Sequence, residues 1–232
     1  MFNLVSTINF IRFLKLNTMN IKVCGITSLD QLTQLDLLHV DYAGLVFDRK
    51  SYQYVADKIE AEEIKYADLD IKKVGVFVNE GFDDIMETVT KYGLDLVQLS
   101  GTESPDVCNL LSKELTVIKT FYIDHFDADM INNMINEYDE SCDYYSFDSN
   151  LKSNRGGITN AFDWKMIGNT SIEKPFFIGG GGVKPSDAPT IHQFKHPDFF
   201  GVDINNNFEK EPGLKDTALV LSFIRAVNQV VN

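Results

Sequence analysis

Two alternating hydrophobic patterns organise the chain from residue 21 onward. Short runs of β-branched and aromatic residues predict buried strands. Between these runs, apolar residues recur three and four positions apart, as on one face of a helix. The predicted strands are residues 21–25, 42–47, 72–79, 94–101, 115–123, 144–149, 175–180 and 199–205. The predicted helices include residues 28–39, 82–93, 104–114, 127–138, 186–194 and 216–231.

Eight strand–helix units follow one another without a Pro/Gly/Ser-rich linker. Such a series describes either an open, doubly wound sheet or a closed (β/α)₈ barrel in a single domain, and eight units favour the barrel. Ser28, Ser104 and Ser186 stand where helix N-caps are expected. The last predicted helix, residues 216–231, would complete the outer ring of helices.

The first eighteen residues are apolar, but Arg12 and Lys15 interrupt them and no small-residue cleavage site follows. The segment is also too short to span a bilayer. We therefore interpret residues 1–18 as a dispensable extension, with a barrel domain over residues 19–232. The alternative is a short helix packed outside the domain.

The composition limits the partners of the chain. A formal net charge of −13 argues against nucleic-acid or anionic-membrane binding, because both need clustered Lys and Arg. Three cysteines form an odd number without CxxC spacing, so neither a disulfide framework nor a structural metal site is predicted. These features favour a reducing, cytoplasmic location.

Two candidate acid-base residues stand at strand ends, where the active site of a (β/α)₈ barrel lies. Cys24 closes the first predicted strand and Asp148 closes the sixth. A thiolate and a carboxylic acid would make a base and an acid facing one substrate. Lys22 shares the face of Cys24 and could favour the thiolate. The structural alternatives are a core thiol, a turn carboxylate and an ordinary rim lysine.

Two loops near the end of the chain predict a phosphate site. The glycine run IGGGGVKP includes Gly181 and Gly182, follows the seventh strand and precedes a helix, so its backbone N–H groups could approach an anion. The eighth strand ends with Asp203, Asn205 and Asn206, whose backbone and amide donors suit phosphate oxygens. A flexible turn would give the same glycine run.

The segments KVCGIT, GLVF, VGVFVN, LDLVQL, FDS, FDW, GGGVKP and VDI occur in an order and at a spacing that resemble phosphoribosylanthranilate isomerase of tryptophan biosynthesis. The resemblance extends from Ile21 to the C-terminus. It implies a TIM barrel that catalyses the Amadori rearrangement of N-(5′-phosphoribosyl)anthranilate to 1-(2-carboxyphenylamino)-1-deoxyribulose 5-phosphate. It further implies a phosphorylated-sugar substrate, no metal and no organic cofactor. We expect a monomer, with a homodimer as the alternative.

The resemblance also assigns roles to matching positions. Asp148 would be the general acid that opens the furanose ring, and Cys24 the general base that removes the C2′ proton. Asp203 would lie near the anthranilate amine. The phosphate would be held by Gly181, Gly182, Asn205 and Asn206.

Several positions depart from the family pattern. Gln53 replaces the arginine expected to bind the anthranilate carboxylate, and Arg49 or Lys50 in the same loop could substitute for it. Ser100 replaces the histidine of QLHG, and residues 205–207 replace SSG. Ile158 and Thr159 stand where the family has Thr-Gly. The alternatives are a divergent barrel paralogue acting on another phosphorylated sugar and a module that only binds one.

Two groups of residues resemble metal ligands. His192 and His196 are four apart, but Pro197 follows at once, which predicts an exposed helix end. Residues 123–129 are rich in acidic side chains, and we interpret them as a solvated loop that caps a helix.

Overall fold

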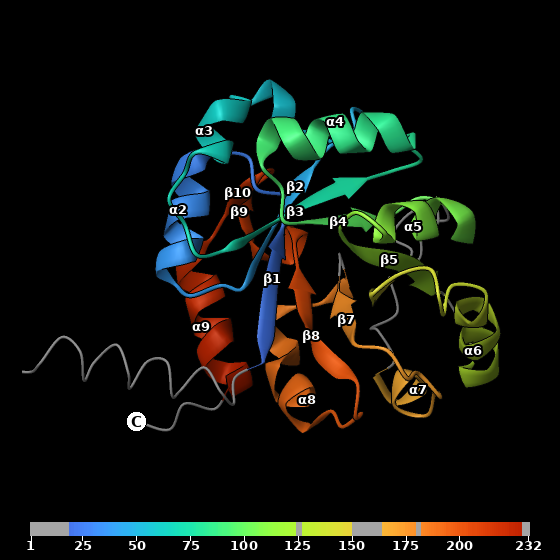
Figure 1. Ribbon diagram of the computed structural model, residues 1–232. Coiled ribbons are helices and arrows are strands. Elements are labelled where there is room, and N and C mark those ends of the chain that lie inside the picture. The colour runs from blue at the N-terminus through green and yellow to red at the C-terminus, as the bar shows by residue number, and fades with distance from the viewer. Residues whose placement is uncertain (1–18, 124–126, 150–163, 180–181, 229–232) are drawn as a thin grey trace, which may run out of the picture.

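Eight parallel strands close into a barrel in chain order. The computed structural model describes residues 19–123, 127–149, 164–179 and 182–228. The (β/α)₈ fold predicted from the alternating pattern is therefore confirmed (Figure 1). The strands are β1 (Asn20–Cys24), β2 (Tyr42–Val46), β3 (Lys72–Phe77), β4 (Leu96–Leu99), β5 (Thr116–Ile123), β6 (Tyr144–Ser149), β7 (Phe176–Gly179) and β8 (Phe199–Ile204).

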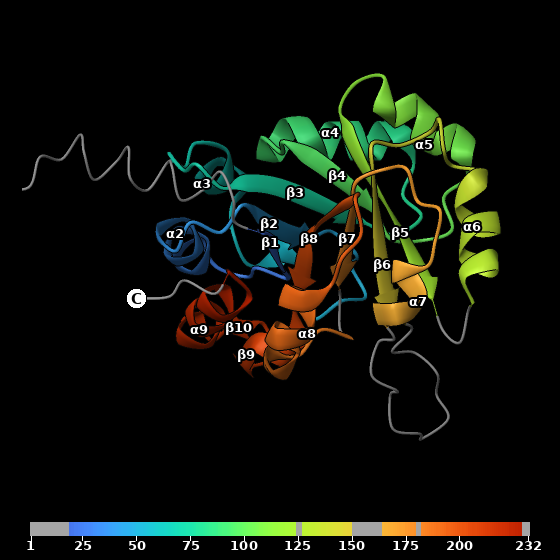
Figure 2. The ribbon, with the colours of Figure 1, turned by 90° about the horizontal axis from the view of Figure 1, so that it is seen from below.

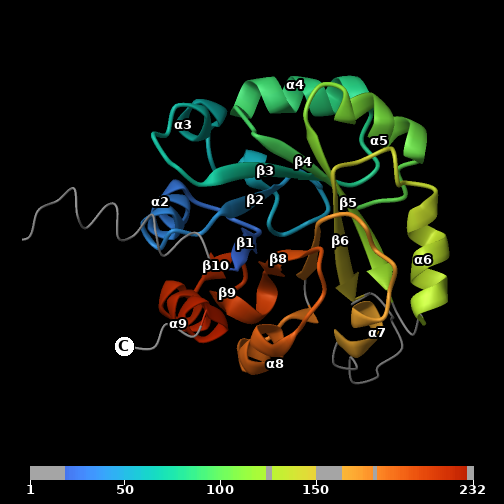
Figure 3. The same ribbon diagram turned by 60° about the horizontal axis from the view of Figure 1, so that its bottom comes forward.

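The helices form a ring outside the strands and follow one another around the barrel (Figure 3). They are α2 (Leu29–Leu37), α3 (Ala61–Lys65), α4 (Phe82–Tyr92), α5 (Pro105–Ser112), α6 (Ala128–Asn136), α7 (Trp164–Gly168), α8 (Ala188–Gln193) and α9 (Thr217–Asn228). A small hairpin, β9 (Glu209–Glu211) and β10 (Leu214–Lys215), follows β8. The sequence pattern did not predict α7.

Apolar residues fill both the space between strands and helices and the lower part of the barrel. On the outer side of β5 and β6, the Phe121 ring packs edge-on against the rings of Tyr138 and Tyr145. In a strand, successive side chains point to opposite faces, so the residues flanking Phe121 point into the barrel. Near the N-terminal ends of the strands, the interior is closed by Tyr42, Val74, Leu96, Ile118, Tyr144, Phe177 and Phe200. The polar side chains inside the barrel therefore lie between this apolar layer and the C-terminal ends of the strands.

Two of the three predicted serine N-caps are confirmed. The Ser28 hydroxyl accepts a hydrogen bond from the N–H of Gln31, and that of Ser104 from the N–H of Val107. The prediction for Ser186 is wrong, because this residue lies inside a 3₁₀ turn, η3 (Pro185–Asp187). The Asp187 carboxylate accepts from the N–H of Lys184 at 2.8 Å, so Asp187 caps this turn instead.

Other parts of the chain bear on the remaining predictions. The extension over residues 1–18 lies outside the described residues. Of the helices that the structure describes, none is both long and apolar enough to cross a membrane. Viewed from below, β5 and β6 run beside α6 and α7, with β7 and β8 next in order (Figure 2). The C-terminal ends of these strands form one rim of the barrel mouth.

Candidate active site

Cys24 lies at the C-terminal end of β1 and is 6% exposed. Its register partner on β2 is Gly44, which has no side chain to fill the space beside the thiol. A Cβ atom at Gly44 would lie 2.7 Å from Cys24 Sγ, too close for an unmoved sulfur atom. Glycine at this position therefore makes room for the thiol inside the barrel.

A buried ion pair lies directly below the thiol. Lys22 Nζ is 2.7 Å from Asp203 Oδ2, and the two residues are register partners on neighbouring strands β1 and β8. The second carboxylate oxygen, Asp203 Oδ1, is buried and has no hydrogen-bond partner among the described residues. A buried acceptor without a donor is costly. Asp203 Oδ1 can therefore receive an N–H or O–H group from a substrate.

Burial keeps Cys24 protonated. It raises the pKa of the thiol above its ordinary value of 9.0, and the charge of Asp203 acts in the same direction. Lys22, which lies within hydrogen-bonding range, and Lys215 both lower this pKa, but burial outweighs them. Lys22 therefore acts in the expected direction, but it does not by itself make Cys24 a thiolate.

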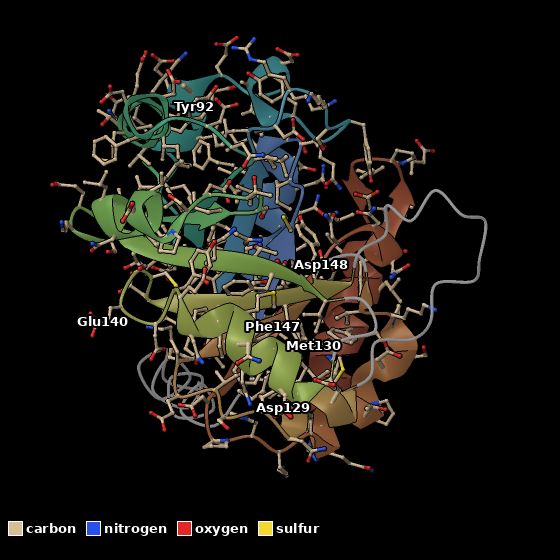
Figure 4. All side chains as sticks on the ribbon, turned by 90° about the vertical axis from the view of Figure 1, so that its right-hand side faces the viewer. Tyr92, Asp129, Met130, Glu140, Phe147 and Asp148 are labelled. Atoms are coloured by element: carbon tan, nitrogen blue, oxygen red, sulfur yellow. The ribbon has the colours of Figure 1, made fainter. Side chains whose placement is uncertain are left out.

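Asp148 lies on β6, one residue before the end of the strand (Figure 4). Phe147 packs outward against the Phe121 and Phe176 rings, so alternation points Asp148 into the barrel. The nearby Tyr122 hydroxyl lies close enough to both Asp148 and Cys24 for their charges to raise its pKa. The two predicted acid-base residues therefore border the same mouth, from β6 and β1.

Gln53 belongs to a closed polar cluster that includes the loop after β8. Its Nε2 lies 2.8 Å from Asn205 Oδ1 and 2.7 Å from Glu209 Oε1. Lys215 Nζ donates to the same two atoms at 2.6 and 2.7 Å. Burial opposes the charge on Glu209, but Lys215 and other donors outweigh it and lower the pKa of Glu209. The amide that replaces the expected arginine is thus fully engaged within the protein.

The backbone next to Cys24 fits this cluster. Gly25 has a φ of +79°, a left-handed conformation that favours glycine. A Cβ atom at Gly25 would collide with the Gln53 amide. The position of Gln53, which is 4% exposed, therefore depends on the glycine that follows the thiol. Sequence reasoning assigned no role to Glu209 or Lys215, although both lie in the segment that continues the VDI motif.

The predicted phosphate residues are only partly described. Gly181 lies outside the described residues, and Gly182 begins the segment that follows. The two loops are tied together, because Asn207 Nδ2 donates to the Val183 carbonyl at 2.8 Å. Asn206 is exposed at the start of a 3₁₀ turn, η4 (Asn206–Phe208). The Asn205 side chain is occupied by the Gln53 cluster, and its carbonyl oxygen accepts from the N–H of Phe208 at 3.0 Å. A phosphate contact at Asn205 would therefore have to use the backbone N–H, and this use stays a prediction.

The other candidates in the loop after β2 lie on its exposed side. Arg49 and Lys50 are both exposed, and the Arg49 guanidinium lies over the Tyr54 ring, 5.8 Å from its centroid. Their use as substitutes for the missing arginine stays a prediction.

The residues that resembled metal ligands have other partners. No group of three or more His, Cys, Asp or Glu that could hold a metal occurs in the described part of the chain. His192 Nδ1 lies 2.9 Å from the Val227 carbonyl oxygen. The His196 side chain is 4% exposed, so the expectation of an exposed helix end is wrong for this residue, which packs against the Phe176 ring. Asp127 caps α6 as predicted, whereas Asp124 and His125 lie outside the described residues.

Comparisons with known proteins identify one family. Residues 21–226 match the family model of N-(5′-phosphoribosyl)anthranilate (PRA) isomerase. The N-(5′-phosphoribosyl)anthranilate isomerase of Parabacteroides distasonis is 36% identical over 214 residues, covering 90% of this chain and 93% of the relative. That of Phocaeicola vulgatus is 33% identical and covers 92% and 100%.

Solved structures of phosphoribosylanthranilate isomerases share the fold of this chain. Phosphoribosylanthranilate isomerase from Thermotoga maritima superposes with a TM-score of 0.78 at 25% identity, covering 92% of this chain and all of that one. A second structure, with a TM-score of 0.73 and 25% identity over the same shares, holds reduced 1-(o-carboxyphenylamino)-1-deoxyribulose 5-phosphate. The barrel, its mouth and the matched family model together show that this chain belongs to the N-(5′-phosphoribosyl)anthranilate isomerase family.

Proposed function

We propose that this protein catalyses the Amadori rearrangement of N-(5′-phosphoribosyl)anthranilate to 1-(2-carboxyphenylamino)-1-deoxyribulose 5-phosphate, a step of tryptophan biosynthesis. The observation that carries this proposal is the placement of Cys24 and Asp148 at one barrel mouth, with Asp203 Oδ1 buried and available as an acceptor. The family match supports the same reaction.

Asp148 acts as the general acid in this mechanism. It gives a proton to the furanose ring oxygen, the C1′–O bond breaks, and the nitrogen lone pair forms the C1′=N iminium. The positive charge acidifies the proton on C2′. Asp148 becomes a carboxylate that can balance the iminium charge.

Cys24 acts as the general base on the opened chain. Its thiolate removes the C2′ proton, which converts the iminium to an enolamine. The enolamine then tautomerises to the ketone, so the electrons and atoms balance without an external oxidant or reductant. Because burial raises the pKa of Cys24, the base is the small fraction of the protein in which the thiol is already ionised, and that fraction limits the rate.

The remaining groups hold the substrate. Asp203 Oδ1 accepts the N–H of the anthranilate amine, since it is the buried acceptor that β8 brings beside Cys24. The phosphate lies at the loops after β7 and β8, against Gly181, Gly182 and the backbone of Asn205 and Asn206. Barrels commonly bind phosphate at these two loops.

A cytoplasmic location and a monomer, with a homodimer as the alternative, belong to the same proposal. The three cysteines are free thiols, which suits a reducing compartment. A related Thermotoga maritima structure is described as monomers generated from a dimeric enzyme. Light scattering of the purified chain would decide between the two assembly states.

The direct test is a fluorescence assay that follows consumption of N-(5′-phosphoribosyl)anthranilate by the purified protein. We expect turnover without an added metal or cofactor. If the protein binds the reduced product analogue but leaves the substrate unchanged, it is a binding module. If it neither binds nor converts these compounds, it acts on another phosphorylated sugar.

A further inference from the structure

Tyr122 lies at the barrel mouth and has no role in the mechanism above. It is the register partner of Asp148 on the adjacent strand, so both side chains point to the same side of the sheet. Thr120, two residues earlier, accepts a hydrogen bond inside the barrel from Gln98 at 3.0 Å. Alternation along β5 therefore directs Tyr122 inward, above Thr120, while Phe121 packs outward.

A chain of hydrogen-bonding groups leads to the Tyr122 hydroxyl. Gln98 Nε2 lies 3.3 Å from Ser100 Oγ, which is also 3.1 Å from Thr120 Oγ1 and near enough to Tyr122 to lower the pKa of its hydroxyl. When the Ser100 hydroxyl turns its proton toward Tyr122 rather than Thr120, the proton of Tyr122 is left for a group outside this chain. Such chains strengthen their terminal donor.

The Tyr122 hydroxyl keeps this proton over the whole physiological range. Burial, followed by the charges of Asp148 and Cys24, raises the pKa of Tyr122 to about 12. The side chain is nevertheless 41% exposed, because its ring borders the open mouth. A donor that is inward-facing, protonated and accessible is suited to an anionic ligand.

The position of the phosphate loops orients the substrate relative to Tyr122. In an eight-stranded barrel, β3 and β4 lie across the mouth from β7 and β8. A ribose whose phosphate lies at β7 and β8 therefore directs its aryl group toward β3, β4 and β5. Val46 on β2 and Val76 on β3 form an apolar wall with Cys24 on β1, which suits the aromatic ring. Ser100 follows β4, the strand next to β3, and Tyr122 lies on β5 beyond it.

The cations nearest the thiol already have partners within the described residues. Lys22 is paired with Asp203, and Lys215 with Glu209. The Gln53 amide donates to Asn205 and Glu209. A neutral donor at β5 can therefore take over recognition of the aryl carboxylate.

We propose that Tyr122, held by Ser100, donates a hydrogen bond to the ortho-carboxylate of the anthranilate group and thereby selects a carboxylated aryl amine. This inference rests on the proposed function and assigns the group that recognises one part of the substrate. Tyr122 is a specificity-determining residue in this account, because it touches the substrate away from the reacting atoms.

The test compares two stable ligands by calorimetry. One is reduced 1-(o-carboxyphenylamino)-1-deoxyribulose 5-phosphate, a stable analogue of the product. The other is the same compound without the carboxyl group on its aromatic ring. Tyr122→Phe should weaken binding of the carboxylated ligand by about 10- to 100-fold, the range for a hydrogen bond to a charged group. Binding of the ligand without a carboxyl group should change by less than about twofold, within the usual effect of a peripheral surface change.

Tyr66→Phe is the matched control, since Tyr66 is an exposed tyrosine at the end of α3. It should leave both affinities unchanged. Equal weakening of both ligands by Tyr122→Phe, or no weakening of either, overturns the assignment while leaving the isomerase proposal intact. If the unmutated protein binds neither ligand, both proposals fail together.

Discussion

Lys22 Nζ lies 2.7 Å from Asp203 Oδ2 inside the barrel, and the two side chains are 1% and 3% exposed. Such a pair is stable only while both partners are present, because a single buried charge cannot be solvated. Burial opposes the charge on Lys22, but Asp203 and Cys24 outweigh it and raise the pKa of Lys22. The lysine therefore stays charged over the physiological range.

We expect Lys22→Met to lower the free energy of unfolding by about 3 to 5 kcal/mol, the range for breaking a buried ion pair. Urea denaturation measures this loss. Lys72→Met is the control, because Lys72 is exposed and pairs with Asp95 at 3.5 Å. The control should cost less than about 1 kcal/mol. If both variants lost the same free energy of unfolding, breaking the buried pair would be no more destabilising than breaking an exposed one.

Cys24→Ser and Asp148→Asn should each reduce kcat by about 10²- to 10⁴-fold, the usual contribution of a general acid or base. Each substitution keeps the size of the side chain and removes its acid-base function. The substrate-consumption assay measures the loss.

Two controls match these variants. Cys108→Ser changes a buried thiol on α5, and Asp129→Asn changes an exposed carboxylate on α6 (Figure 4). Both should retain turnover. Normal turnover in either active-site variant would remove the corresponding role.

The thiolate fraction of Cys24 in the free protein should rise with pH up to at least pH 9, because burial raises the pKa of the thiol. At pH 7 a thiol with a pKa above 9.0 is less than about 1% thiolate. The rate of Cys24 alkylation by iodoacetamide, corrected with the Cys24→Ser variant, should therefore rise about tenfold per pH unit in this range. Alkylation follows the base alone, whereas kcat/KM depends also on the protonated fraction of Asp148. A plateau of the alkylation rate below pH 8 would mean that the thiol is already activated in the free enzyme.

Gln53→Arg should lower KM for N-(5′-phosphoribosyl)anthranilate by about 10- to 100-fold, the gain expected from a charge-assisted hydrogen bond to the aryl carboxylate. The added cation would lie beside Glu209, which now accepts from the Gln53 amide at 2.7 Å. Steady-state kinetics measures the change.

Gln53→Met provides the comparison, because it keeps the length of the side chain without adding charge. It should not lower KM. An unchanged KM in Gln53→Arg would indicate that Glu209 neutralises the new guanidinium before the substrate reaches it.

The strands were predictable because each is a short run rich in β-branched or aromatic residues. The pattern placed β1 at residues 21–25 and the structure places it at Asn20–Cys24. Helix ends were less certain, since several side chains can compete to cap the same turn. At the start of η3, the Asp187 carboxylate rather than the Ser186 hydroxyl accepts the hydrogen bond from the N–H of Lys184.

The candidate site was only partly predictable for a related reason. Cys24 and Asp148 stand out in sequence because a thiol and a carboxylate interrupt apolar strands. Tyr122 does not, since tyrosine is an ordinary strand residue. Only the pairing of β5 with β6 shows that it lies beside Asp148.

The protonated state of Cys24 bears on how the enzyme withstands oxidants. Peroxides and alkylating reagents react chiefly with the thiolate form of cysteine and only slowly with the protonated thiol. The Cys24 sulfur beside Gly44 is a protonated thiol in the resting enzyme. We therefore expect it to resist oxidation that would inactivate an enzyme whose catalytic cysteine is a thiolate.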